Sequence, residues 1–320
     1  MQISPKVVYS PGYDIRFLGL EKLHPFDSCK YSRTWNALGD IFGDRLQQYS
    51  LVPAVPASVE MLQTVHTDAY LQQLKYSRYV ARALELSSLE LLPIGILDRR
   101  ILKSMRLATA GTVMAAQSAL ATGIAVNLSG GYHHASQDRG QGFCIYSDIA
   151  IAIAILRQSG KLSPEDDIVI IDLDAHQGNG LGRIFDRDSN VHILDMYNHQ
   201  IYPNDPQAKA RIDIDLPLAS GTRDDDYLGT LKEHLPTFLN QINQPKIAFY
   251  NAGTDIYEFD PLGQLKVSQQ GILERDLFVF QTLTSKGIPW VMVLSGGYTR
   301  ESYQLVTNSI AYILHTWEKH

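Results

Sequence analysis

The sequence has little cysteine and no long apolar run, and both shortages narrow the range of functions. Cys29 and Cys144 are the only cysteines in 320 residues, which excludes the disulfide framework of small secreted proteins. No apolar stretch approaches the roughly 20 residues that a membrane-spanning helix needs. The N-terminal MQISPKVVYS also lacks the charged and apolar regions of a signal peptide. We therefore expect a protein that has no membrane span. Its expected location is the cytoplasm, and also the nucleus if the source is eukaryotic.

The chain has no excess of positive charge and no segment that resembles a repeat, a linker or a low-complexity tract. Its 28 Lys and Arg against 34 Asp and Glu give a formal net charge of −6, which argues against a broad nucleic-acid-binding surface. The hydrophobic content of 45% is enough for a substantial core. We expect residues 1–320 to form a single catalytic domain without direct nucleic-acid contacts, and the composition leaves the oligomeric state open.

Apolar, β-like runs alternate with helical patterns along most of the chain. We expect strands at 6–9, 124–128, 168–171, 191–194, 247–250 and 290–294. Helices are expected at 31–42, 58–74, 102–121, 148–158, 225–242, 268–286 and 301–316, with Pro236 kinking or splitting the helix that contains it. This alternation predicts a single-domain α/β fold with a mostly parallel sheet flanked by helices on both faces.

The central stretch 168–180 reads IVIIDLDAHQGNG. Its first four residues are β-branched, which is typical of a strand buried on both faces. On an extended backbone, Asp172, Asp174 and His176 would point to one face, because their spacing is i, i+2, i+4. Two carboxylates so close together favour a cation between them, and Asp and His are suitable ligands for zinc or a similar divalent ion.

Further polar residues follow other expected strands: His133, His134, Asp195, Asp255 and Tyr298. In open α/β sheets, active sites form at the carboxyl edge of the strands. Asp174, His176 and Asp255 would give a three-ligand metal site with positions left for water and substrate. A metal held in this way lowers the pKa of bound water and polarises a carbonyl group.

The remaining side chains complete a hydrolytic site. His133 and His134 could act as general base and general acid, and Asp172 and Asn179 are the candidates to orient them. Tyr298 follows Gly296-Gly297 and could donate a hydrogen bond to the developing oxyanion. The set indicates metal-assisted hydrolysis of an amide or ester, and the absence of a G-x-S-x-G sequence disfavours a serine hydrolase.

Four motifs carry a family resemblance: GGYHHASQDRGQGFC, IIDLDAHQGNG, NAGTD and SGGY. Together they resemble the zinc-dependent histone deacetylase family, which has the arginase–deacetylase fold. The phrases YSPGYDIRFLGLEKLHPFD, VHTDAYL and MYNHQIYP look like its class IV branch. The resemblance extends from about Val8 to the last expected helix, and therefore over nearly the whole chain.

The resemblance implies a role for each matching residue. Asp174, His176 and Asp255 match the zinc ligands, His133 and His134 the tandem histidines, and Tyr298 the transition-state tyrosine. His134 would be the general base, with Asp172 behind His133 and Asn179 behind His134. Gly142, Phe143 and Tyr202 match walls of the acyl-lysine channel, and Leu262 a rim position. A structural potassium ion is implied beside Asp172, Asp174, His176 and Asp195, and Lys30 stands near a position that is often Arg in class I members.

These features predict an enzyme that uses one zinc ion to hydrolyse the amide of an Nε-acyl-lysine in a peptide or protein. The class IV resemblance implies that long-chain acyl groups can be preferred over acetyl. A deacetylase of small acylated amines, such as acetylpolyamines, is an alternative. A binuclear manganese ureohydrolase and a catalytically silent acyl-lysine-binding module are two further alternatives. The sequence leaves the physiological substrate and the native metal open.

Overall fold

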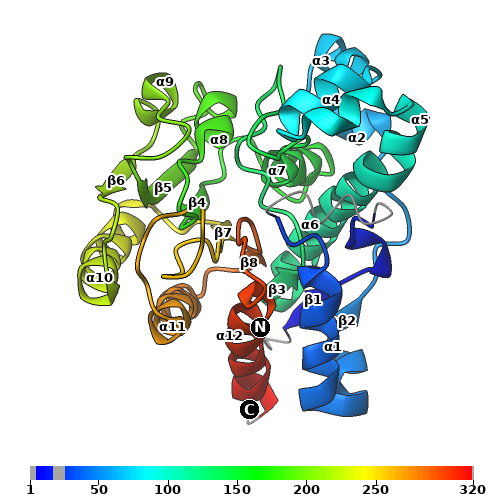
Figure 1. The fold of residues 1–320 in the computed structure, drawn as a ribbon. Coiled ribbons are helices and arrows are strands. Elements are labelled where there is room, and N and C mark those ends of the chain that lie inside the picture. The colour runs from blue at the N-terminus through cyan, green and yellow to red at the C-terminus, as the bar shows by residue number, and fades with distance from the viewer. Residues whose placement is uncertain (1–4, 17–25, 319–320) are drawn as a thin grey trace.

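Eight parallel strands form one sheet in the computed structural model, which describes residues 5–16 and 26–318 (Figure 1). The strands are β1 (Lys6–Val8), β2 (Ser50–Leu51), β3 (Ile124–Asn127), β4 (Ile168–Asp172), β5 (Val191–Asn198), β6 (Ile214–Leu218), β7 (Ile247–Asn251) and β8 (Trp290–Val293). Their order across the sheet is β2-β1-β3-β8-β7-β4-β5-β6, and every neighbouring pair is parallel. The expected single-domain α/β architecture is therefore confirmed.

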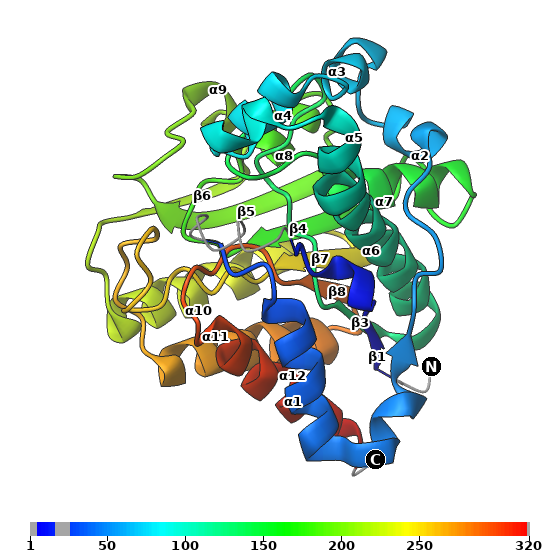
Figure 2. The ribbon, with the colours of Figure 1, turned by 45° about the vertical axis from the view of Figure 1, so that its right-hand side comes forward.

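Helices cover both faces of this sheet (Figure 2). One face packs against α6 (Lys103–Thr122) and α7 (Asp148–Gln158), and the other against α1 (Lys30–Phe42), α10 (Asp224–Gln241), α11 (Gln269–Ser285) and α12 (Ser302–Glu318). The central strand contributes alternate side chains to the two cores, because Ile168 and Ile170 lie in one and Val169 and Ile171 in the other. This two-sided burial explains the continuous apolar run in the sequence.

Shorter helices gather at one end of the molecule, at the top of Figure 1. They are α2 (Val59–Gln63), α3 (Asp68–Gln73), α4 (Ser77–Ala83), α5 (Ile94–Leu97), α8 (Asn179–Ile184) and α9 (Pro206–Lys209). The single helix expected at 58–74 is wrong, because it is divided into α2 and α3. The break occurs where the Thr67 hydroxyl accepts a hydrogen bond from the Tyr70 backbone N–H and caps a new helix.

Two further differences involve proline. Of the two effects expected of Pro236, a kink or a split, the split is wrong, because α10 continues through the proline. Leu235 and Phe238, on either side of the proline, lie in the same apolar core and hold both halves of the helix in place. Strand β6 was not expected, because Pro217 interrupts its pattern. β6 lies at the edge of the sheet, where a residue without an N–H is tolerated.

The sheet brings distant loops together at its carboxyl edge. Strands β3, β8, β7 and β4 are neighbours, and the segments 128–147, 294–298, 252–260 and 173–178 follow them in that order. Among the helices of the described ranges, none is both long enough and apolar enough to cross a membrane.

Candidate metal centre and active site

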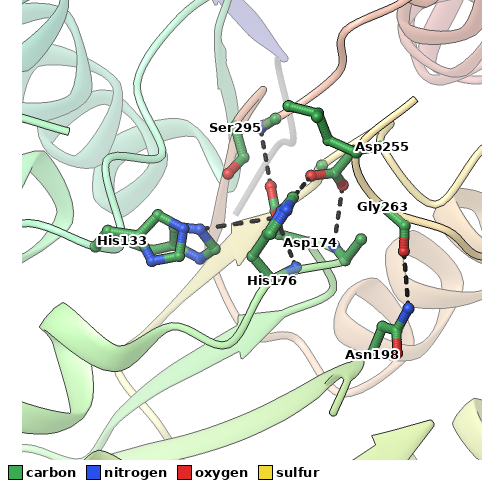
Figure 3. Close-up of polar contacts among 12 residues, drawn as sticks. His133, Asp174, His176, Asn198, Asp255, Gly263 and Ser295 are labelled. Carbon is green, nitrogen blue, oxygen red and sulfur yellow. Dashed lines mark hydrogen bonds and ion pairs between the residues drawn. The ribbon is translucent and has the colours of Figure 1, made fainter. Parts of the chain in front are cut away.

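Asp174, His176 and Asp255 converge beyond the ends of β4 and β7 (Figure 3). Their candidate ligand atoms all lie within 4.8 Å of one another, and the three side chains are buried. His176 Nδ1 is 3.1 Å from Asp174 Oδ1 and 2.9 Å from Asp255 Oδ2. Within residues 5–16 and 26–318, this is the one group of three or more such side chains that could hold a metal ion.

The backbone that carries two of these side chains is not extended, contrary to the interpretation of the sequence. β4 ends at Asp172, and the chain then turns. Asp172 Oδ1 accepts a hydrogen bond from the Asp174 N–H at 3.3 Å, and Asp174 Oδ1 accepts one from the His176 N–H at 3.0 Å. Asp255 Oδ1 accepts from the Ala175 N–H at 2.9 Å. The carboxylates therefore fold the loop that presents them, a frequent use of Asp in turns.

The donor set fits a divalent cation. Burial and the neighbouring Asp174 raise the pKa of Asp255, and a cation between the two carboxylates would offset their repulsion. Burial opposes a charge on His176, but Asp174 and Asp255 outweigh it and raise its pKa to about 10. Gly296 leaves this space open, because a Cβ atom there would lie 2.3 Å from Asp255 Oδ2. Two carboxylates and one imidazole suit zinc, and also iron(II) or cobalt.

The two adjacent histidines have different partners and opposite charge preferences. His133 Nδ1 is 2.8 Å from Asp172 Oδ2, and His134 Nδ1 is 2.8 Å from Asn179 Oδ1. Burial opposes a charge on His133, but Asp172 and Asp174 raise its pKa to about 9. Burial lowers the pKa of His134 well below its usual value, and the nearby His133 and His176 lower it further. These opposite shifts favour the charged form of His133 and the neutral form of His134, a combination that suits an acid and a base.

Tyr298 faces the metal-ligand group from the loop after β8. Its ring centroid lies 6.2 Å from that of His176 and 5.9 Å from that of Phe143, both in edge-on contact. Burial and the nearby Asp255 and Asp174 raise the pKa of its hydroxyl well above the usual value. The phenol therefore keeps its proton and can donate a hydrogen bond.

Lys30 in α1 forms hydrogen bonds to the loop after β8, which also carries Tyr298. Its ammonium group is fully buried and donates to the Ser295 carbonyl at 2.6 Å and the Gly296 carbonyl at 3.1 Å. Burial lowers its pKa to about 8, although Asp255 and Asp174 counteract part of that effect. Lys30 thus connects the first long helix to the segment that carries Tyr298.

Asp195 was expected directly after the strand at 191–194, but it lies inside β5, opposite Asp172. Its Oδ2 accepts a hydrogen bond from the Gly178 N–H at 2.8 Å, whereas its buried Oδ1 has no hydrogen-bond partner in the part of the chain that the structure describes. Burial and the nearby Asp172 raise the pKa of Asp195 well above its usual value. An unpartnered carboxylate oxygen beside a second carboxylate is compatible with a bound monovalent cation.

A largely apolar cavity begins at the histidine pair and Tyr298. Gly142, Phe143, His133, His134 and Tyr298 line one part of it, and it continues toward α4, α6 and the turn between α4 and α5. The lining there is Ile15, Phe26, Tyr31, Leu84, Leu86, Leu89, Ile101 and Met105. Gly142 has a positive φ of 52°, and a Cβ atom there would lie 2.4 Å from the His134 ring, so only glycine fits at this wall.

The other two predicted channel residues lie outside this lining. Tyr202 is 44% exposed and packs edge-on against His134, with 5.3 Å between ring centroids. Leu262 is half-buried in a turn whose first residue is Asp260. Their roles at the wall and rim of a channel stay predictions.

Three polar residues of the site were not singled out from the sequence. Asn251 donates through Nδ2 to Asp172 Oδ1 at 2.8 Å. Asp260 accepts from the backbone N–H groups of Tyr298 and Leu262, at 2.8 Å and 2.9 Å. Asp205 accepts from Asn179 Nδ2 at 3.4 Å. Two of them had a local signal, because Asp205 precedes Pro206 as a helix cap and Asp260 begins a D-x-x-G turn.

Comparisons with known proteins found a family model and similar relatives for this chain. The model of the histone deacetylase domain matches residues 24–314. Histone deacetylase 2 of Arabidopsis thaliana is 42% identical over 304 residues, which cover 95% of this chain and 77% of the relative.

Two solved structures share the fold. The crystal structure of the HDA15 HD domain superposes with a TM-score of 0.76 at 17% identity, covering 99% of this chain and 90% of that one. The structure of an HDAC homolog from Aquifex aeolicus gives a TM-score of 0.75 at 22% identity, covering 98% and 84%.

Proposed function

Since this chain belongs to the histone deacetylase family and is a hydrolase of amide bonds, we propose that it uses one zinc ion to remove acyl groups from the Nε atom of lysine. The observation that carries this proposal is the convergence of Asp174, His176 and Asp255 within 4.8 Å, next to a charged and a neutral histidine. A single group of three ligands among the described residues favours one ion over the two of a ureohydrolase.

The chain's own residues would divide the work as follows. A divalent ion held by Asp174, His176 and Asp255 would polarise the acyl carbonyl and activate water. The neutral His134 would accept the proton of the attacking water through Nε2, because its Nδ1–H is engaged by Asn179. The charged His133, held by Asp172, would stabilise the developing negative charge and supply a proton to the leaving amine. The protonated Tyr298 would donate to the oxyanion.

We further propose that the acyl group can be a long chain, as the class IV resemblance implies. The support is the apolar lining that continues from the histidine pair to Leu84, Leu86, Leu89, Ile101 and Met105. An acetyl group would fill only the beginning of such a cavity, whereas a long chain would bury apolar surface worth about 0.8 kcal/mol per methylene.

Turnover of matched acetyl-lysine and dodecanoyl-lysine peptides tests this proposal. We expect the long chain to be preferred in kcat/KM, and Leu86→Trp to reduce its turnover at least about tenfold, since a bulkier side chain would obstruct the cavity. Acetyl turnover by the same variant is the internal control for folding and metal content. A preference for acetyl, or equal losses for both peptides, would contradict the long-chain assignment.

A potassium ion beside Asp172, Asp174, His176 and Asp195 belongs to the same proposal, with the unpartnered Asp195 Oδ1 as its support.

Competition between the acyl peptides and an acetylpolyamine separates the lysine deacylase from the alternative that acts on small acylated amines. Tight peptide binding by zinc-loaded protein without turnover would instead identify an acyl-lysine-binding module. The cytoplasmic location and the absence of direct nucleic-acid contacts stay predictions.

A further inference from the structure

A carboxylate lies behind Asn179, on the side away from the histidine pair. Asn179 Oδ1 is 2.8 Å from His134 Nδ1, and Asn179 Nδ2 is 3.4 Å from Asp205 Oδ2. The amide is 2% exposed, and the Asp205 side chain is 11% exposed. Three side chains therefore form a line from the candidate general base to a carboxylate in the segment between β5 and α9.

The chemistry of this line permits only one orientation of the Asn179 amide. An ionised carboxylate has no hydrogen to donate, so the amide must turn its NH₂ group toward Asp205. Its oxygen then faces His134 and can only accept. His134 Nδ1 must therefore carry the proton, and Nε2 keeps the lone pair that a general base requires. If the amide were reversed, its NH₂ group would face Nδ1 and favour the tautomer with the proton on Nε2.

Asp205 is itself held from two directions. Arg183 donates to both of its carboxylate oxygens, from Nε at 2.6 Å and from Nη2 at 2.9 Å. The Gln177 side chain accepts from the Asp205 backbone N–H at 2.8 Å and donates to the Asp205 carbonyl at 3.2 Å. Arg183 holds the pKa of Asp205 below its usual value, although burial acts in the opposite direction. The carboxylate therefore stays ionised and fixed in place.

We propose that Asp205, held by Arg183 and Gln177, is a positioning residue that sets the amide of Asn179 and thereby the tautomer of His134. The inference rests on the proposed function, in which His134 is the general base. It extends that function to a residue that touches neither substrate nor metal.

Asp205→Asn tests the proposal with little change in shape. The variant can still cap α9, because Asn caps helices as well as Asp does, but its amide no longer dictates how Asn179 turns. We expect kcat to fall roughly 10- to 100-fold, with KM nearly unchanged. This is the usual range when a residue that orients a functional side chain through a hydrogen bond is removed. Nitrogen chemical shifts of His134 in the metal-free protein should change from the Nδ1–H tautomer to a mixture of both tautomers.

Asp188→Asn is the matched control, because it removes a half-buried carboxylate that pairs with Arg157 instead. It should leave kcat and the His134 spectrum as in the wild type. If Asp205→Asn also left both unchanged, the proposal would be wrong. The spectrum needs no turnover, so it tests the positioning role even if the wild type hydrolyses no acyl substrate and the proposed function fails.

A double-variant cycle tests the pairing itself. Asn179→Asp alone places two carboxylates against each other and removes the donor between them. Combined with Asp205→Asn, it restores one donor and one acceptor across the same contact. We expect the double variant to recover kcat about tenfold over the Asn179→Asp single variant, since contacting residues are coupled. If the loss in kcat of the double variant equalled the product of the losses of the two single variants, the proposal would be contradicted.

Discussion

Neighbouring histidines acquire different chemistry because their partners differ. His133 faces the carboxylates of Asp172 and Asp174, which stabilise its charged form, whereas His134 faces the neutral amide of Asn179 and the rings of His133 and His176. The two imidazole rings are 4.1 Å apart between centroids, yet one favours the charged form that donates a proton and the other the neutral form that accepts one. Pairs of groups whose pKa values are pushed apart are a frequent sign of acid–base catalysis.

Tyr298→Phe should affect the chemical step and not substrate binding. The hydroxyl is protonated because burial and nearby carboxylates raise its pKa, and its loss removes one donor to the oxyanion. We expect kcat to fall about 100- to 1,000-fold with little change in KM, measured by steady-state acyl release from zinc-loaded protein. Tyr197→Phe, which removes a hydroxyl bonded to Asp215 in the edge strand β6, is the control. Equal activity of the Tyr298 variant and the wild type would remove Tyr298 from the mechanism.

Among the single elements of the fold, the loop between β3 and α7 carries the histidine pair, and two hydrogen bonds to His66 hold it in place. Its Nδ1 donates to the Ser136 carbonyl at 2.9 Å, and its Nε2 accepts from the Ser147 N–H at 3.0 Å. The ring is 2% exposed. Both nitrogen atoms are occupied, so the fold requires the neutral imidazole.

This arrangement predicts a loss of stability in acid. Burial lowers the pKa of His66 to about 4, against roughly 6.5 in the unfolded chain. The stabilising contribution is therefore complete above about pH 6.5 and is lost as the pH falls toward 4, by about 3 kcal/mol in total. Urea unfolding between pH 4 and 7 should give a flatter profile for His66→Gln than for the wild type. His192→Gln serves as the control, and parallel profiles for His66→Gln and the wild type would contradict the assignment.

One guanidinium group contacts three backbone carbonyls in and next to the turn between α8 and β5. Arg211 donates to the Phe185 carbonyl at 2.6 Å, to the Asp188 carbonyl at 2.7 Å and to the Val191 carbonyl. Arg211→Met keeps the aliphatic part of the side chain but leaves three carbonyls without this donor. We expect the free energy of unfolding to fall by about 2–4 kcal/mol, measured by denaturant titration. Arg187→Met, at an exposed side chain in the same segment, should change it by less than about 0.5 kcal/mol.

For the whole molecule, the parallel sheet explains how much of the site the sequence could reveal. Asp174, His176, Asp255, His134 and Tyr298 each belong to a short motif next to a strand, and parallel strands deliver their carboxyl ends to one edge. The residue types and the edge were therefore predictable from local patterns. The turn that presents Asp174 and His176 was not, because it depends on hydrogen bonds from carboxylates to the backbone.

Contacts between distant segments account for the rest. Asp205 and Asp260 have local signals only as a helix cap and a turn residue. They meet Asn179 and Tyr298 only after the sheet has formed, so the local sequence does not show their role at the site. β6 was not recognised because Pro217 obscures an edge strand, and the 58–74 helix was overextended because Thr67 caps a new helix. In each case, a tertiary or capping interaction overrides the local pattern.

Metal binding should stabilise the whole fold, since the ligands come from loops that follow two different strands. At a free zinc concentration 100 times the dissociation constant, the folded state should gain about 2.7 kcal/mol. Thermal unfolding with and without zinc measures this gain, and Asp255→Asn should abolish most of it. An unfolding midpoint that does not respond to zinc in the wild type would contradict the metal site.

The most direct test of the central claim is a zinc titration of metal-free protein, followed by the rate of acyl release from an acyl-lysine peptide. We expect no turnover without metal, a linear rise on addition of zinc, and a plateau at one ion per chain. Turnover that persists in metal-free protein, or a plateau at two ions, would contradict it.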